Sequence, residues 1–200
     1  MKFGKQWALL LMLVITLCLP YVIKAQQNQD EGLEFEENLK IPFLKDKYKG
    51  GVVSTQLALG KRLISKGFVV ETIQDGTILI VSVPSNKIFN ANEIVISHSV
   101  ELSKLRDNIP NPRYYKFLLA MHCDDTGNAI YKDNITTDRV ISIYDWFSEY
   151  AKNFDVIPYA IADTEPIVPN NSMLNRSKNR RLEIYIIPNE LMIQHIKDNY

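Results

Sequence analysis

The chain has 200 residues, in which 23 lysine and arginine side chains balance 23 aspartate and glutamate side chains. Hydrophobic residues make up 46% of it, enough for one domain with a substantial core. A sequence pI near 6.8 excludes the strongly basic surface that is typical of nucleic-acid-binding proteins.

Residues 1–25 have the organisation of a signal peptide. Lys2 and Lys5 precede an apolar run, and Ala25 offers a small side chain at the expected cleavage site. The apolar span from Trp7 to Leu19 is shorter than the roughly 20 residues that a membrane-spanning helix needs. We therefore predict export rather than a membrane anchor, and cleavage leaves a mildly acidic chain.

Cys123 is the only cysteine that remains after the predicted cleavage. A single cysteine forms no intrachain disulfide, so Cys123 is expected to be either a buried small side chain or a free thiol. Cys18 follows Leu17, where lipoprotein signals carry a small residue. We therefore do not expect lipidation.

Residues 26–50 are predicted to be a linker without an assigned function. Gln, Asn, Asp and Glu dominate its first part, a composition typical of flexible spacers, and Pro42 interrupts any regular pattern after it. A leading helix is predicted over residues 51–67, with Gly67 at its C-cap. The expected apolar face of this helix carries Val53, Leu57, Gly60 and Ile64.

A β-hairpin is predicted to begin the sheet of the following domain, residues 68–200. Its strands, Phe68–Ile73 and Thr77–Val83, flank Asp75 and Gly76, and Asp-Gly between two β-rich runs is a strong hairpin signal. A helix is then predicted over Glu93–Asn108, with Val95, Leu102 and Leu105 buried.

The central part of the chain carries the candidate site. Tyr114–Met121 is predicted to be a buried strand that ends at a polar turn, His122–Gly127. Thr136 is the predicted N-cap of the next helix, which places Arg139 in its first turn. The apolar positions of that helix are Val140, Ile143, Tyr144, Phe147, Ala151 and Phe154.

Asp124 and Arg139 are predicted to form a binding crevice. A carboxylate at a strand end and a guanidinium at a helix start can hold a small zwitterion: Asp124 would bind an ammonium, and Arg139 with the free N–H groups of the helix terminus would bind a carboxylate. The alternative is an exposed Arg139 that is balanced locally by Asp138.

The remaining chain is predicted to complete a two-layer α/β sandwich. Phe154–Ala162 is a strand in which Pro158 indicates an edge or a bulge, and Asp163–Lys178 is a polar loop. Arg181–Ile187 is a closing strand, and a short helix follows within residues 189–200.

Two motifs in this order resemble the OmpA-like peptidoglycan-binding domain family. The first combines Cys123-Asp124-Asp125-Thr126-Gly127 with Ile135-Thr136-Thr137-Asp138-Arg139-Val140; the second is Asn175-Arg176-Ser177-Lys178-Asn179-Arg180-Arg181-Leu182-Glu183-Ile184. The resemblance implies a mixed sheet with helices packed on one face, in β–α–β–α–β order. It also implies non-catalytic peptidoglycan binding through stem-peptide diaminopimelate, in the periplasm or at the periplasmic face of the outer membrane.

The resemblance also implies the residues of the site and its partners. Asp124 and Arg139 would bind the ligand together with Asp125, Thr126 and Gly127 of the turn. Arg180 and Arg181 are secondary candidates. No cofactor and no nucleic acid is implied, and outer-membrane proteins are possible partners.

The chain departs from the family pattern at Cys123, Lys132, Ala160 and Ala162. These changes motivate an alternative function, in which the domain has lost its ligand and acts as a structural or protein-interaction component of an outer-membrane assembly. Lys132 stands where the family has Asn; its ammonium could occupy Asp124, but an extended position in solvent is expected.

Other chemistry is not expected. His122 and Cys123 are adjacent on a strand and point to opposite faces, so they form no base and nucleophile pair. His122, Asp124 and Asp125 lie too close together in sequence to converge on a metal ion, and no histidine at helical spacing supports them. We predict neither an enzyme nor a metal site.

Overall fold

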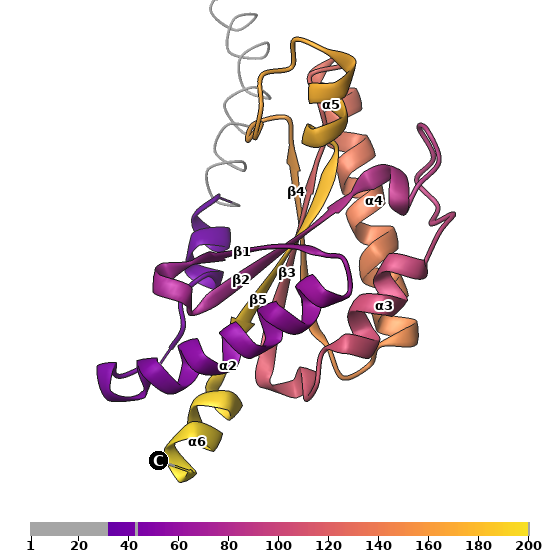
Figure 1. Ribbon diagram of the computed structural model, residues 1–200. Coiled ribbons are helices and arrows are strands. Elements are labelled where there is room, and N and C mark those ends of the chain that lie inside the picture. The colour runs from indigo at the N-terminus through magenta and orange to yellow at the C-terminus, as the bar shows by residue number, and fades with distance from the viewer. Residues whose placement is uncertain (1–31, 43, 200) are drawn as a thin grey trace, which may run out of the picture. The chain divides into compact units, whose positions relative to one another are not determined.

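The computed structural model describes residues 32–42 and 44–199 (Figure 1). The predicted signal peptide lies outside these ranges. The chain divides into two units, residues 1–40 and 41–200. In the first unit residues 32–38 are helical, where we expected a flexible spacer. None of the described helices is long and apolar enough to cross a membrane.

The second unit is built on a five-stranded mixed sheet, which confirms the predicted fold class. Its strands are β1 (Val69–Ile73), β2 (Ile78–Pro84), β3 (Tyr115–His122), β4 (Asp155–Ala162) and β5 (Arg181–Pro188). Their order is β1-β2-β5-β3-β4, and only β3 and β4 run parallel. β4 is therefore an edge strand, as Pro158 indicated.

The helices of this unit are α2 (Asp46–Ser65), α3 (Val100–Asn108), α4 (Ala129–Tyr150), α5 (Met173–Asn179) and α6 (Glu190–Asp198). One core cluster joins α2, α3 and α4 to the same face of the sheet (Figure 1). The strand residues in it alternate along each strand: Leu79, Val81 and Val83; Phe117, Leu119 and Met121; Leu182, Ile184 and Ile186.

The leading helix differs from its prediction in length and in its buried face. α2 begins at Asp46, within the predicted linker, and ends at Ser65 before Gly67, which has a φ of +86°. Its buried positions are Val52, Gln56, Leu59, Gly60 and Leu63, whereas Leu57 and Ile64 are exposed. The predicted face was therefore wrong at Leu57 and Ile64, while Val53 is half-buried and Gly60 is buried, because two adjacent stripes of this helix both carry apolar residues.

The segment after the hairpin also differs from its prediction. The β1–β2 hairpin forms around Gln74–Gly76 (η1), but the helix expected from Glu93 begins only at Val100. Val95 is exposed, while Leu102 and Leu105 are fully buried. Residues 90–99, referred to below as the 90–99 segment, contain no helix or strand and pass beside α4.

The central helix starts earlier than predicted. Asn128 is the N-cap of α4, and its side chain accepts a hydrogen bond from the backbone N–H of Tyr131 at 2.8 Å. Thr136 lies inside the helix, where its hydroxyl donates to the carbonyls of Lys132 and Asp133. The prediction of Thr136 as N-cap was therefore wrong, and Arg139 lies in the third turn rather than the first.

The predicted loop between β4 and β5 contains a short helix, α5, whose N-cap is Ser172. At the other end of this connection Ala162 has a φ of +55°, and the β3–β4 register shifts beside it, where His122 pairs with Ala162. An alanine in this left-handed region costs roughly 1 kcal/mol relative to a glycine.

Candidate functional site

A pocket of about 290 Å³ lies where β3 ends and α4 passes the 90–99 segment. Ten residues line it: Ala91, Asn92, Cys123, Asp124, Thr126, Tyr131, Lys132, Ile135, Arg139 and Arg180. Four of these, Asp124, Thr126, Arg139 and Arg180, belong to the predicted ligand-binding residues. The pocket therefore brings together groups that are 56 residues apart in sequence.

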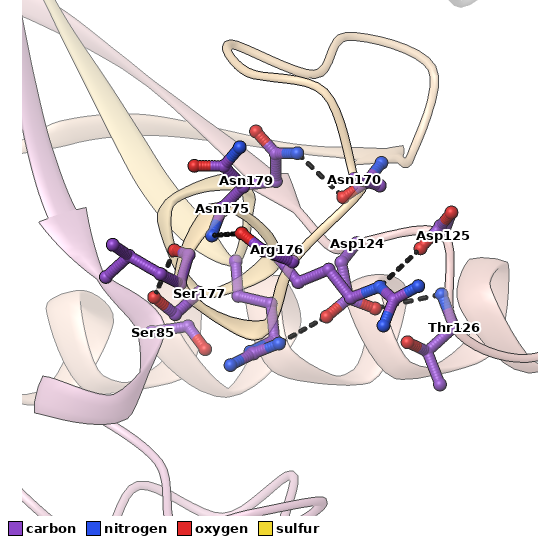
Figure 2. A network of polar contacts seen from close by, with 12 residues as sticks. Ser85, Asp124, Asp125, Thr126, Asn170, Asn175, Arg176, Ser177 and Asn179 are labelled. Carbon is purple, nitrogen blue, oxygen red and sulfur yellow. Dashed lines mark hydrogen bonds and ion pairs between the residues drawn. The ribbon is translucent and has the colours of Figure 1, made fainter.

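Asp124 supplies the negative charge of this pocket. It follows β3 directly, is 5% exposed, and its Oδ1 accepts a hydrogen bond of 2.9 Å from the backbone N–H of Thr126 (Figure 2). Burial acts to raise the pKa of Asp124, but the contacts from Thr126 and Arg180 outweigh it and hold that pKa below its usual value. The carboxylate is ionised at neutral pH.

Arg139 supplies a buried positive charge. It is 3% exposed, and its guanidinium donates to the backbone carbonyls of Glu93 at 2.9 Å and Ala91 at 2.6 Å. It also lies 4.8 Å from the ring centroid of Phe89. These contacts hold the 90–99 segment against α4.

Arg139 donates to three neutral acceptors: the carbonyls of Ala91 and Glu93 and, at 3.5 Å, the hydroxyl of Ser85. No carboxylate in the described part of the chain pairs with it. Burial lowers the pKa of Arg139 from its usual value, although a guanidinium stays charged at neutral pH. A buried cation without a counter-ion favours binding of an anion, since the anion would offset the cost of desolvation.

Arg180 occupies the other side of Asp124. Its Nη1 forms an ion pair with Asp124 Oδ2 while its own side chain remains 42% exposed. Asn179, directly before it, is fully buried and fixes the preceding loop: its side chain bonds to Ile167, Val168 and Asn170. Arg180 thus follows a loop fixed by hydrogen bonds, and its half-exposed guanidinium is paired with Asp124.

Lys132 neither binds Asp124 nor extends into solvent. Its ammonium pairs with Asp163, and the two side chains are 16% and 25% exposed. The hydrogen bond from Lys132 to Asp163 raises the pKa of Lys132. The expected position in solvent was therefore wrong, because the connection after β4 brings a carboxylate within reach.

The other three predicted site residues lie outside the pocket lining. Asp125 pairs with Arg176 of α5 at 3.1 Å (Figure 2). Gly127 has a φ of +98°, and a Cβ there would lie 2.6 Å from the ring of Tyr131, so its role is in the turn. Arg181 is buried and pairs with Glu183 at 2.7 Å.

Sequence reasoning missed Ala91, Asn92, Tyr131 and Ile135. The first two belong to the 90–99 segment, which was predicted to be largely helical, and Ala91 has a φ of +31°. Tyr131 and Ile135 lie in the first two turns of α4, which precede the predicted N-cap, Thr136. The Asn128 cap, three residues before Tyr131, was the signal that could have revealed them.

Cys123 lines the pocket as a protonated thiol. Burial, with further contributions from the nearby carboxylates, raises its pKa to about 12, so the nucleophilic thiolate is not available at neutral pH. Within the described part of the chain no group of three or more His, Cys, Asp or Glu side chains is placed to hold a metal ion.

Comparisons with known proteins find likeness only at the level of structure. No family model matches the sequence, and no curated protein matches it. A MotB-like protein from Desulfovibrio vulgaris shares 17% identity, with 69% of this chain and 94% of that chain covered, at a TM-score of 0.59. The cell wall anchor of the T6SS from Pseudomonas aeruginosa shares 20% identity, with 68% and 96% covered, at a TM-score of 0.50. At these identities the likeness is one of fold.

Proposed function

We propose that this domain binds peptidoglycan without catalysis, as part of an exported protein of the cell envelope. The ligand is the diaminopimelate residue of a stem peptide, whose ammonium and carboxylate are held by Asp124 and Arg139. One observation carries the proposal: an ionised carboxylate and a buried guanidinium without a carboxylate partner line the same pocket. The likeness in fold to a cell wall anchor supports it.

The geometry favours a zwitterion over a simple cation or anion. Arg139 keeps two N–H donors that no described residue accepts, enough for a bidentate carboxylate. Asp124 offers an oxygen to an ammonium once Arg180 turns away. Diaminopimelate differs from lysine by the carboxylate on its terminal carbon, so Arg139 is the group that distinguishes the two.

Sedimentation with purified sacculi tests this proposal. The purified protein is expected to sediment with sacculi that carry diaminopimelate at the third stem position. It should remain in the supernatant with sacculi that carry lysine there, since Arg139 then stays unpaired. Free meso-diaminopimelate should compete for binding while free lysine should not. Equal sedimentation with both kinds of sacculi would contradict the proposal.

The Asp124–Arg180 ion pair favours a second candidate function. Arg180 already neutralises the Asp124 carboxylate, which the ligand's ammonium would otherwise bind. A domain that has lost its ligand needs such an internal partner for its buried carboxylate. In that case the domain is a structural or protein-interaction component of an outer-membrane assembly. The two candidates differ in what happens when Arg180 is removed.

Arg180→Gln is expected to strengthen binding to diaminopimelate-type sacculi by up to about fivefold. An ion pair with one half-exposed partner contributes about 0 to 1 kcal/mol, and the ligand no longer has to displace it. Arg180→Lys keeps the charge and is the matched control, with affinity near that of the native protein. A native protein that binds nothing, with binding restored by Arg180→Gln, would favour the second candidate.

A further inference from the structure

A second pocket, of about 450 Å³, lies further along α4 between α3 and the 90–99 segment. It is lined by Ile96, Ser97, Ser99, Ser103, Arg106, Trp146 and Tyr150, and the hydroxyl of Ser97 already donates to Glu93 at 2.8 Å. None of these residues lines the first pocket or belongs to the motifs that suggested peptidoglycan binding.

Two aromatic side chains form one wall of this second pocket. The rings of Trp146 and Tyr150 lie 5.6 Å apart at 38°, and Tyr150 is 54% exposed. Trp146 is only 9% exposed, and its second neighbour, Phe147, meets it edge to face. The aromatic surface is thus fixed by packing on its inner side and open at Tyr150.

Trp146 also carries a polar group that remains unused. Its indole N–H makes no hydrogen bond to any described residue, although buried tryptophans usually find a partner for this donor. The hydroxyls of Ser99 and Ser103 also make no hydrogen bond to any residue that the structure describes. The pocket therefore presents an indole donor and two hydroxyls beside an aromatic wall.

Arg106 completes the lining without leaving a free charge. Its Nε donates to Asp107 at 2.8 Å and its Nη1 to the carbonyl of Tyr150 at 3.4 Å, with the guanidinium 5.7 Å from the Trp146 ring centroid. Because Asp107 neutralises it, Arg106 offers its remaining N–H groups as donors rather than an unpaired cation. This argues against an anion as the ligand.

We propose that this second pocket binds a pyranose ring of an N-acetylated amino sugar. The C–H face of such a ring packs against the electron-rich face of an aromatic side chain, here Tyr150. Its hydroxyls bond to Ser99 and Ser103, and its acetamide carbonyl accepts from Trp146 or Arg106. A purely apolar ligand would desolvate these groups and leave them without hydrogen-bond partners.

The distance between the two pockets suggests that the sugar and the stem peptide belong to the same peptidoglycan strand. This step rests on the proposed function. Arg139 and Trp146 are seven residues apart on one face of α4, a rise of about 10 Å. Two to three extended stem-peptide residues span about 7 to 11 Å. One glycan with its peptide would therefore reach both pockets, and the 90–99 segment borders each of them.

Trp146 fluorescence tests the sugar site directly. Of the two tryptophans, Trp7 lies in the predicted signal peptide, so Trp146 is the single reporter in the chain that remains after cleavage. Titration of this mature chain with an N-acetylglucosamine tetramer, which has no stem peptide, is expected to give a saturable change with a Kd below about 10 mM. A glucose tetramer should give none. Absence of a saturable change, or an equal response to both tetramers, would overturn the proposal.

Two variants locate this response on the pocket. Tyr150→Ala is expected to weaken binding at least about tenfold, since it removes the exposed aromatic surface. Tyr144→Ala is the matched control, because Tyr144 is an exposed tyrosine of α4 outside the pocket. An equal loss in both variants would contradict the assignment to this pocket.

Asp124→Asn separates this inference from the proposed function. It should leave tetramer binding unchanged while it removes recognition of diaminopimelate. Loss of tetramer binding in Asp124→Asn would show that the sugar does not occupy a separate site.

Discussion

Arg139→Gln is expected to abolish sedimentation with diaminopimelate-type sacculi. The substitution leaves the ligand's carboxylate without a charged partner in a buried pocket, and loss of one member of a desolvated pair costs about 2 to 5 kcal/mol. That corresponds to a loss of affinity of roughly 30-fold to several thousandfold. The measurement is the fraction of protein bound at increasing amounts of sacculi.

Arg139 also has a structural role that this experiment must separate from binding. Its guanidinium holds the carbonyls of Ala91 and Glu93, so Arg139→Gln should lower the free energy of unfolding by about 1 to 3 kcal/mol. Asp124→Asn, which is nearly isosteric, should lose binding with a smaller effect on stability.

Arg113→Gln is the matched arginine control for this series. Arg113 is exposed and contacts Asn153, away from the pocket lining, and the variant should bind like the native protein. Retention of sacculus binding by folded Asp124→Asn and Arg139→Gln proteins would refute the assignment of the ligand's two charges.

Glu183→Gln is expected to lower the free energy of unfolding by about 3 to 5 kcal/mol. Glu183 lies on the sheet face opposite the helices, where it pairs with buried Arg181 at 2.7 Å and accepts from Tyr185 at 2.9 Å. His122 Nε2 lies 3.5 Å away, slightly long for a hydrogen bond. Removal of the negative charge leaves the Arg181 cation buried without a counter-ion.

The Glu183 carboxylate also makes the stability of the domain depend on pH. Burial raises the pKa of Glu183, but the contacts with His122 and Arg181 outweigh burial and lower it to about 2 from its usual 4.5. The resulting stabilisation, about 3 kcal/mol, is complete above pH 4.5 and is lost as the pH falls toward 2.

Urea unfolding between pH 2 and 6 measures this contribution. Glu183→Gln should lose less stability than the native protein over the lower part of that range. Glu71→Gln, an exposed substitution on β1, should change the free energy of unfolding by less than about 0.5 kcal/mol and keep the native pH profile. A Glu183→Gln profile parallel to the native one would contradict the assignment.

Local sequence was enough to predict part of the lining of the candidate pocket. Asp124 follows a strongly apolar strand and precedes Thr126 and Gly127, so the strand end and its turn depend on neighbouring residues alone. Arg139 was predicted to line the crevice with Asp124 because it was expected in the first turn of its helix. It does line the pocket, but it lies in the interior of α4. Its environment depends on carbonyls of the 90–99 segment, about 46 residues earlier, rather than on a helix terminus.

Other features depend on contacts that no local pattern encodes. The pairing of Arg180 with Asp124 and of Lys132 with Asp163 follows from the meeting of three loops at one end of the sheet. α5 is only seven residues long, too short to be stable as an isolated helix, so it depends on the Ser172 cap and on the loop that holds it. The buried face of α2 differs from the predicted face because the apolar residues of this helix form two adjacent stripes, and only the packing against the sheet selects one of them.

The place of β5 in the sheet sets the order in which the domain can fold. β5 is the last of the five strands along the chain, yet it lies between β2 and β3 and pairs Ile186 with Leu79, 107 residues earlier. Until it inserts, β2 and β3 each present an unpaired inner edge, and such edges promote aggregation. Folding dominated by such distant pairings is slow. Arg180 directly precedes β5, so the pocket is completed only in the step that closes the sheet.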